Sequence, residues 1–254
     1  MNPPSVREAE KILKGVMART AGLRKTEIVI FPPSVFIERL VKIAGRSKIR
    51  LGAQDVSVQS GSGAFTGEVS ADMFYDSRAR YAIAGHSERR NPSAGRGESN
   101  HEINFKIKAA LAAGLSPVLC VGERERDRDH AYLQLIKSQV EECLKGISKK
   151  SMEKMIIAYE PVWAIGRNAV REAVPEEFQE MKIFIKKILA DKFGIVPADT
   201  VRILYGGSVS PKNAEGFLRE GEADGFLVGR DSLSPDKFGR IAKIAEDAGQ
   251  WRLS

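Results

Sequence analysis

The stretch MIIAYEPVWAIG, residues 155–166, decides how we interpret the fold of this chain. Residues 155–158 form a short apolar run, which is typical of a parallel strand buried on both faces. Pro161 ends the run because proline has no backbone N–H to donate. Glu160 is therefore predicted at the carboxyl end of a strand, where α/β sheets build their active sites. Shielded from water there, its carboxyl group would have a raised pKa and act as a general base near neutral pH. The alternative is a structural glutamate held by backbone donors.

Strand-like and helix-like segments alternate along the rest of the chain. Alternation at this length predicts a parallel sheet, and the even spacing, without a dinucleotide-binding fingerprint, favours a closed (β/α)₈ TIM barrel over a doubly wound sheet. We identify seven strands, and the first predicted helix has no strand ahead of it, so the first strand of the barrel is expected to be missing from this chain. The predicted strands are residues 27–31, 49–53, 81–84, 116–121, 155–158, 201–205 and 225–228.

Composition predicts one soluble α/β domain over residues 1–254, since no linker rich in Pro, Gly or Ser divides the chain. No apolar run approaches the roughly 18 residues of a membrane span, so no membrane partner is expected. The formal net charge is +7. Because Lys and Arg are scattered along predicted helices, this charge favours attraction of a small phosphorylated anion over nucleic-acid binding. Cys120 and Cys143 define no disulfide framework, which predicts a cytoplasmic location.

Polar residues and glycines collect where predicted strands end. His86 follows residues 81–84, although a lone histidine more often has a structural role than a catalytic one. Gly206 and Gly207 precede Ser208, and Gly229 follows the last predicted strand. Glycines before a helix start leave amides free for phosphate, and the loops after strands seven and eight are the usual phosphate site of this barrel. Tight turns are the alternative. No Cys/His cluster has the spacing of a metal site.

Six motifs resemble those of the triosephosphate isomerase family, in that family's order and over nearly the whole chain. They are GAFTGE (63–68), GHSERR (85–90), VGE (121–123), AYEPVWAIG (158–166), LYGGSV (204–209) and GFLVG (225–229). The resemblance implies a cofactor-free isomerase that interconverts dihydroxyacetone phosphate and D-glyceraldehyde 3-phosphate through an enediolate, in glycolysis and gluconeogenesis. Its expected partners are a phosphorylated triose and a second copy of the chain in a homodimer.

The resemblance also implies a role for individual residues. Glu160 is similar to the base that moves a proton between two substrate carbons, and His86 to the neutral electrophile, a pairing for which this family is the standard worked example. Glu98 resembles a second, supporting carboxylate. The lid over Glu160 is predicted at residues 162–166. Residues resembling the phosphate grip are Ile165, Gly166, Ser208, Gly229 and Arg230, and Thr66 lies in the loop that reaches into the neighbouring subunit.

The chain departs from the family pattern in three places. The family begins with a strand ending in an Asn-x-Lys segment, and here Met1 and Asn2 lead directly into the first helix. We therefore expect a natural product with a further N-terminal segment; the alternative is a catalytically silent or impaired phosphate-binding barrel. The lid ends in Arg167, Asn168 and following residues that do not match the family's usual hinge. Arg230 stands where a second glycine is common, and its guanidinium either faces solvent or contacts an anion.

Overall fold

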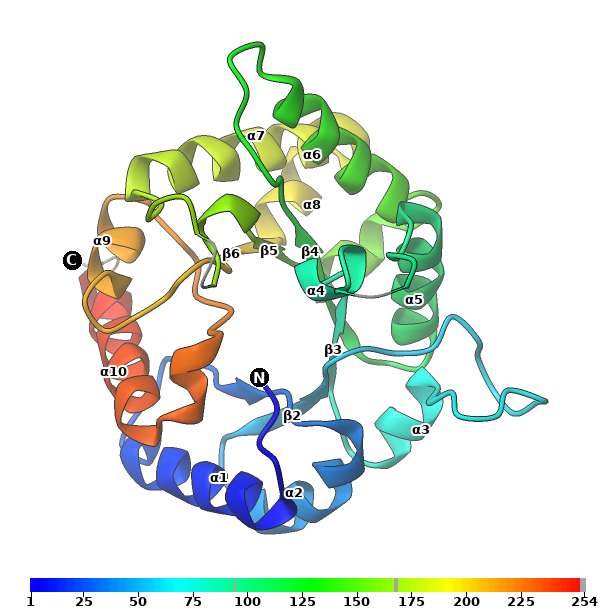
Figure 1. Ribbon diagram of the computed structural model, residues 1–254, viewed down its shortest axis with the longest axis vertical. Helices are drawn as coiled ribbons and strands as arrows, with labels where there is room; N and C mark the ends of the chain where they lie inside the picture. The colour runs from blue at the N-terminus through cyan, green and yellow to red at the C-terminus, as the bar shows by residue number, and fades with distance from the viewer. Residues whose placement is uncertain (94, 167–168, 252–254) are drawn as a thin grey trace.

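Six parallel strands form one curved sheet in the computed structural model, and their order across the sheet is their order along the chain. The structure describes residues 1–93, 95–166 and 169–251. The predicted parallel α/β sheet is confirmed, and Figure 1 shows it lining the inside of a ring of helices. The strands are β1 Val29–Ile30, β2 Arg50–Ala53, β3 Tyr81–Ala84, β4 Ser116–Val121, β5 Ile156–Tyr159 and β6 Arg202–Tyr205.

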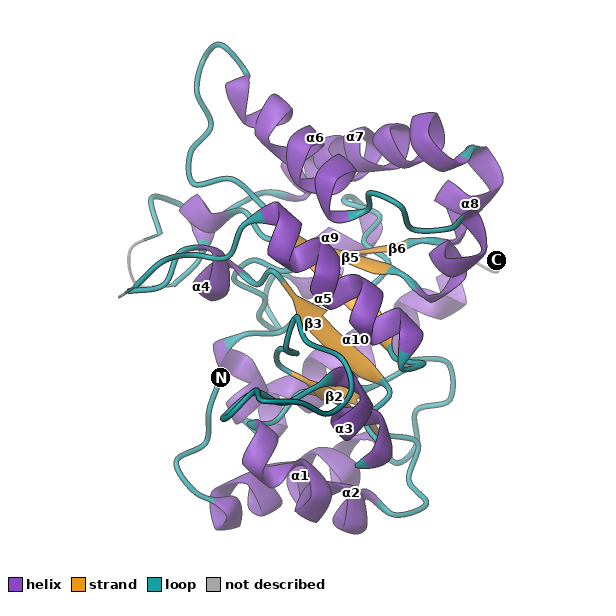
Figure 2. Ribbon diagram, turned by 90° about the vertical axis from the view of Figure 1, so that its right-hand side faces the viewer, coloured by secondary structure: helices purple, strands orange, loops and turns teal. Residues whose placement is uncertain are grey.

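Helices cover the outer face of the sheet, as the view in Figure 2 also shows. Most follow a strand and return the chain to the next one, which is the connection that parallel strands require. Among the described residues, no helix is both long enough and apolar enough to cross a membrane. The helices are α1 Val6–Thr20, α2 Ile37–Ala44, α3 Ala71–Asp76, α4 Ser87–Arg90, α5 Asn100–Ala112, α6 Ala131–Cys143, α7 Pro175–Phe193, α8 Ile195–Thr200, α9 Ala214–Arg219 and α10 Pro235–Trp251.

The seventh predicted strand, residues 225–228, is not a strand in the structure. Its pairing is a single bridge between Phe226 and Tyr205 of β6. Gly225 has φ +153°, outside the strand region, and only one side of the segment has a neighbouring strand within the described residues. With a neighbour on one side only, the segment forms no ladder beyond this bridge. The prediction of seven strands was therefore wrong by one.

The largest hydrophobic core lies between strands β3 to β6 and the helices outside them. Its aromatic centre is built by α7, β6 and α9: the rings of Tyr205 and Phe217 stack with centroids 3.7 Å apart, and Phe178 meets Tyr205 edge to face at 5.6 Å. A smaller cluster joins α1, α2 and β1. Burial on this scale fixes the ends of β3 to β6 and therefore the side chains that follow them.

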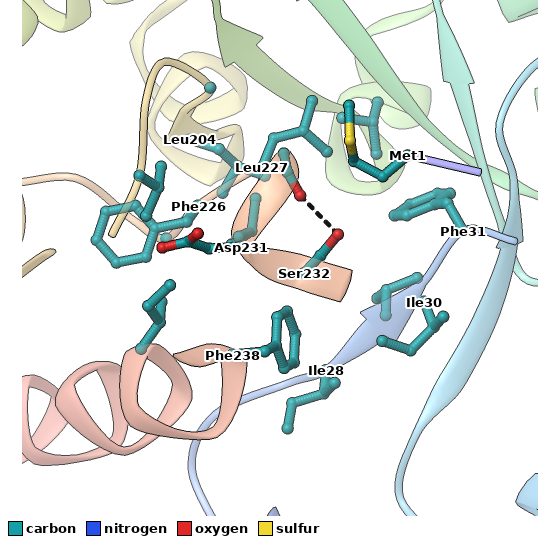
Figure 3. A pocket seen from close by; sticks show the side chains of 18 of the residues that line it. Met1, Ile28, Ile30, Phe31, Leu204, Phe226, Leu227, Asp231, Ser232 and Phe238 are labelled. Atoms are coloured by element: carbon teal, nitrogen blue, oxygen red, sulfur yellow. Dashed lines mark hydrogen bonds between the residues drawn. The ribbon is translucent and has the colours of Figure 1, made fainter. Parts of the chain in front are cut away.

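The ring is not closed by hydrogen bonds between β1 and residues 225–228. A cavity of about 1240 Å³ extends into this gap. Figure 3 shows Ile30 and Phe31 of the β1 region on one side of it and Leu227 on the other, with Phe238 of α10 beside Ile28. Apolar side chains thus line two facing edges of the structure that have no strand between them.

A buried carboxylate spans the open side of the ring. Glu246 of α10 accepts hydrogen bonds from the backbone amides of Arg24, Lys25 and Thr26, at 2.7, 3.0 and 2.8 Å. These donors lower the pKa of Glu246 to about 2, against the opposing effect of burial. The last helix therefore holds the loop that leads into β1.

Candidate active site

Glu160 lies directly after β5, at the carboxyl end of the sheet, as predicted. Its amide donates to the carbonyl of Val121 at 2.8 Å, which continues the β4–β5 ladder by one residue. The residue is 2% exposed. Burial raises the pKa of Glu160, while His86 and the N–H of Ser87 oppose this rise. A carboxylate in this position has the properties of a general base that works near neutral pH.

His86 contacts Glu160 from the end of β3. Its Nε2 lies 3.1 Å from Glu160 Oε1, and the amide of Ser87 donates to Glu160 Oε2 at 2.8 Å. The other ring nitrogen, Nδ1, accepts from the amide of Glu88 at 3.3 Å. Because Nδ1 accepts, Nε2 is the ring nitrogen that donates toward Glu160. The two predicted catalytic side chains therefore meet within hydrogen-bonding distance.

The residues predicted to grip phosphate line the same cavity as His86 and Glu160. The cavity contains Ile165 and Gly166 from the lid, Ser208 after β6, and Gly229 and Arg230 beyond the Phe226 bridge. In the structure, the Ser208 hydroxyl donates to the carbonyl of Ala164 at 2.8 Å, which joins this loop to the lid. The amides of Gly229 and Arg230 donate to no group among the described residues. Free amides and two reactive side chains thus share one cavity.

Comparison with known proteins assigns the family. Residues 1–245 match the family model described as triosephosphate isomerase. The chain is 41% identical over 237 residues to the triosephosphate isomerase of Dictyoglomus thermophilum, which covers 93% of each chain. The chain belongs to the triosephosphate isomerase family. It is also 44% identical over 225 residues to the triosephosphate isomerase of Bifidobacterium adolescentis, covering 87% of this chain and 83% of that protein. Membership of the triosephosphate isomerase family makes the chain an isomerase.

Gly206, which the sequence suggested only for phosphate, and Gly122, which it did not single out, give this isomerase its close packing around Glu160. A Cβ on Gly206 would lie 2.9 Å from Glu160 Cγ, and one on Gly122 would lie 1.8 Å from the Glu160 carbonyl oxygen. Both glycines follow strands, at the ends of β6 and β4, which flank β5. Both lie inside the quoted motifs, so the signal was present, but the reason for it is a contact between strands.

The segment predicted as a lid, residues 162–166, begins in a polar network. The indole of Trp163 and the hydroxyl of Tyr159 donate to Glu123 Oε1 at 2.8 and 2.6 Å. The Arg171 guanidinium lies over the Trp163 ring at 4.4 Å and pairs with Glu177 of α7. Residues on both sides of the lid therefore contact Trp163. The predicted departures at Arg167 and Asn168 lie outside the described residues.

Glu98 lies in a cluster of charges beside the reacting pair, not against it. Its Oε1 accepts from Lys106 at 2.7 Å and from Arg89 at 2.6 Å, and Lys106 also donates to both oxygens of Asp55 at 2.6 Å. No hydrogen bond joins Glu98 to Glu160 or His86 among the described residues, and Glu98 Oε2 is buried without a partner there. Lys106 is 5% exposed and was missed, since a lysine within a helical sequence carries no mark of burial.

Thr66 is exposed in the loop that precedes α3, which projects from the ring in Figure 1. It does not line the cavity. Over the described residues, no group of three or more His, Cys, Asp or Glu side chains is placed to hold a metal ion.

Proposed function

We propose that the chain interconverts dihydroxyacetone phosphate and D-glyceraldehyde 3-phosphate, as an enzyme of central carbon metabolism. The observation that carries this proposal is the 3.1 Å contact between His86 and Glu160 inside a cavity that also holds the free amides of Gly229 and Arg230. A base, a neutral donor and an anion-binding loop are the groups that a phosphorylated hydroxycarbonyl compound needs for proton transfer.

In the proposed reaction, Glu160 removes a proton from the substrate carbon beside the carbonyl. The electrons of that C–H bond form a carbon–carbon double bond, and the carbonyl oxygen takes up negative charge as an enediolate. The Nε2–H of His86 donates to this oxygen and stabilises it. His86 Nε2 gives its proton to this oxygen and takes up the hydroxyl proton from the oxygen of the first carbon. Glu160 returns its proton to the neighbouring carbon, and the oxygen of the first carbon becomes the new carbonyl oxygen. Every atom and electron stays within the substrate and these two side chains, so the reaction needs no external oxidant or cofactor.

The phosphate group fits the part of the cavity lined by Gly166, Ser208, Gly229 and Arg230. Backbone amides there bind an anion without a change of protonation. A lid formed by residues 162–166, when closed over the cavity, keeps water from the enediolate. Glu98 is proposed to act through its charge cluster, by holding the Arg89 and Lys106 side chains beside the loop that carries His86.

The direct test is the isomerase rate of the 254-residue chain on glyceraldehyde 3-phosphate, with Glu160→Gln as the control. A positioned general base contributes about a hundredfold to ten-thousandfold to a rate, so the control should lose at least about two orders of magnitude. Equal rates for the two proteins would contradict the proposal. That result would favour the alternative, a phosphate-binding barrel that is catalytically silent.

We also propose that the gap between β1 and residues 225–228 takes one further parallel strand, the first strand predicted to be missing. Apolar side chains on both edges support this proposal, as does the pairing of β1 with β2 only. Extending the chain ahead of Met1 by an apolar strand ending in Asn-x-Lys should raise the melting temperature and the isomerase rate. A matched extension with alternating prolines, which cannot donate to a ladder, is the control, and equal effects of the two would contradict the proposal.

A homodimer and a cytoplasmic location complete the proposed function, with residues 1–254 acting as one domain. The projecting loop around Thr66 has Phe65 39% exposed, and Val35 is 80% exposed, which favours a partner surface. Both cysteines are unpaired and buried, as in a reducing compartment. Light scattering after size-exclusion chromatography tests the dimer: Thr66→Arg should shift the protein toward monomer, and a wild-type monomer would contradict it.

A further inference from the structure

Arg230 is a free cation at the mouth of the reaction cavity. It lies at the first position of the short 3₁₀ turn Arg230–Leu233 and is exposed. Its guanidinium forms no ion pair or hydrogen bond with any described residue. It also lines the cavity that holds His86 and Glu160. The side chain is therefore available to a ligand that enters this cavity.

Arg230 is an unpaired cation, among the described residues, at the end of the cavity that contains His86 and Glu160. We call this the reacting end. Arg89 also lines this end, but it is paired with Asp55 at 3.0 Å and with Glu98 at 2.6 Å. Arg202 lies at the opposite end of the strands and pairs with Glu27 at 2.8 Å. Among the described Lys and Arg side chains that line the reacting end, Arg230 alone has no partner.

Carboxylates make the same end of the cavity unfavourable for an anion unless a cation is present. Glu88, Glu160 and Glu172 line the cavity and have no Lys or Arg partner among the described residues. A phosphate dianion placed near them meets like charges, which repel it in a partly buried site. A free guanidinium offsets this repulsion and offers donors in a planar fork that fits phosphate.

The backbone that carries Arg230 is held on both sides. Ser232 donates to the Gly229 carbonyl through its amide at 3.0 Å and its hydroxyl at 2.6 Å, the bond drawn in Figure 3. Asp231 pairs with Lys237 of α10 at 2.9 Å, so this neighbouring carboxylate does not compete for Arg230. A cation on a fixed turn loses less conformational freedom when it binds a ligand.

We propose that the guanidinium of Arg230 binds the phosphate group of the substrate and adds a charged side-chain contact to the amides of the turn. This inference rests on the proposed function for its substrate. It assigns a binding role to the side chain at the position where the family pattern has a second glycine. Arg230 acts on binding and not on the proton transfer, so its removal raises KM and leaves kcat nearly unchanged.

The test compares Arg230→Met with Arg240→Met. Arg240 is exposed on α10 and does not line the cavity, so its loss makes the same change in net charge without removing the contact. We expect Arg230→Met to raise KM for glyceraldehyde 3-phosphate by roughly tenfold, the usual worth of one hydrogen-bonded charge. The rate on unphosphorylated glyceraldehyde should be unchanged, and Arg230→Lys should recover part of the loss. Equal KM values for Arg230→Met and Arg240→Met would overturn the inference.

Titration of each protein with inorganic phosphate in a calorimeter separates this inference from the proposed function. We expect the dissociation constant of phosphate to rise roughly tenfold in Arg230→Met and to stay at the wild-type value in Arg240→Met. If the wild-type chain binds phosphate through Arg230 but shows no isomerase activity, the proposed function fails and the inference stands. Phosphate binding that is unaffected by Arg230→Met overturns the inference, whatever the isomerase rate.

Discussion

The sector from β3 to β6 and the sector from residue 225 to β1 perform different tasks in the same ring. Strands β3 to β6 pair in continuous register over the largest core, and they end in His86, Gly122, Glu160 and Gly206. On the other side, β1 has two residues, and the 225–228 segment has one bridge. Proton transfer needs positions held to fractions of an ångström, and these lie on the continuous sector. The proposed phosphate contacts, which are loop amides and a long cation, lie on the open sector.

Polar contacts also differ between the two sectors. The continuous sector contains a buried lysine bound to two carboxylates, and the open sector is held by Glu246 and three backbone amides. We infer that stability in the first depends on packing and buried charge, and in the second on tethers between distant segments. Substitutions in one sector should therefore leave the contacts of the other sector in place.

The largest expected effect is the loss of stability in Lys106→Met. Lys106 neutralises Asp55 and Glu98, and burial already raises the pKa of Asp55. Removing one partner of a buried charge cluster costs about 3–5 kcal/mol, which denaturant unfolding measures. Lys108→Met on the same helix removes a half-buried charge that lies over Phe105 and has no carboxylate partner among the described residues, and it should cost less than about 1 kcal/mol. A similar cost for both variants would mean that the cluster does not stabilise the sector.

Gly206→Ala should reduce activity more than stability. The new methyl group would lie 2.9 Å from Glu160 Cγ, so the base must move, and a displacement of about 1 Å costs roughly a hundredfold in rate. The measurement is kcat by a coupled assay. Gly22→Ala is the matched control, because a Cβ there has no neighbour within 4 Å. An active Gly206→Ala enzyme would show that the position of Glu160 is not fixed by this contact.

Glu246→Gln tests the open sector. Its pKa is lowered to about 2 from the ordinary value of 4.5, so the carboxylate stabilises the fold above pH 4.5 and loses this effect as the pH falls toward 2. At pH 7 the variant should lose about 2 kcal/mol, and the difference from wild type should shrink in acid. Asp247→Asn removes only an exposed pair with Lys243 and serves as the control. A difference that is independent of pH would exclude this explanation.

The smallest effect concerns the acid side of the pH–rate profile. In the proposed mechanism Glu160 acts as a base when ionised, and burial raises its pKa, so kcat/KM should fall at a higher pH than an ordinary glutamate would give. His86 opposes this rise. In His86→Gln, the residual kcat/KM should therefore begin to fall in acid at a still higher pH. Movement of the limb to lower pH would show that His86 does not stabilise the ionised carboxylate.

The sequence predicted the continuous sector better than the open one. Short apolar runs followed by Glu160 and His86 marked strand ends because both faces of those strands are buried. Residues 225–228 have a similar composition, yet they form one bridge, since a strand also needs partners that local sequence does not specify. The burial of Lys106 was not predicted because its partner Asp55 is 51 residues away in the sequence. The phosphate and dimer residues, and the missing first strand, stay predictions.

Trp163 gives the protein a built-in optical probe. The chain has two tryptophans, Trp163 and Trp251, so a Trp251→Phe protein would fluoresce from the lid alone. The indole donates to buried Glu123 and lies under the Arg171 guanidinium, and emission from indole depends on nearby charge and on water. Lid motion lies in the microsecond to millisecond range, which stopped-flow and temperature-jump instruments reach. If residues 162–166 act as the proposed lid, Trp163 can thus report the opening rate of that lid without any added label.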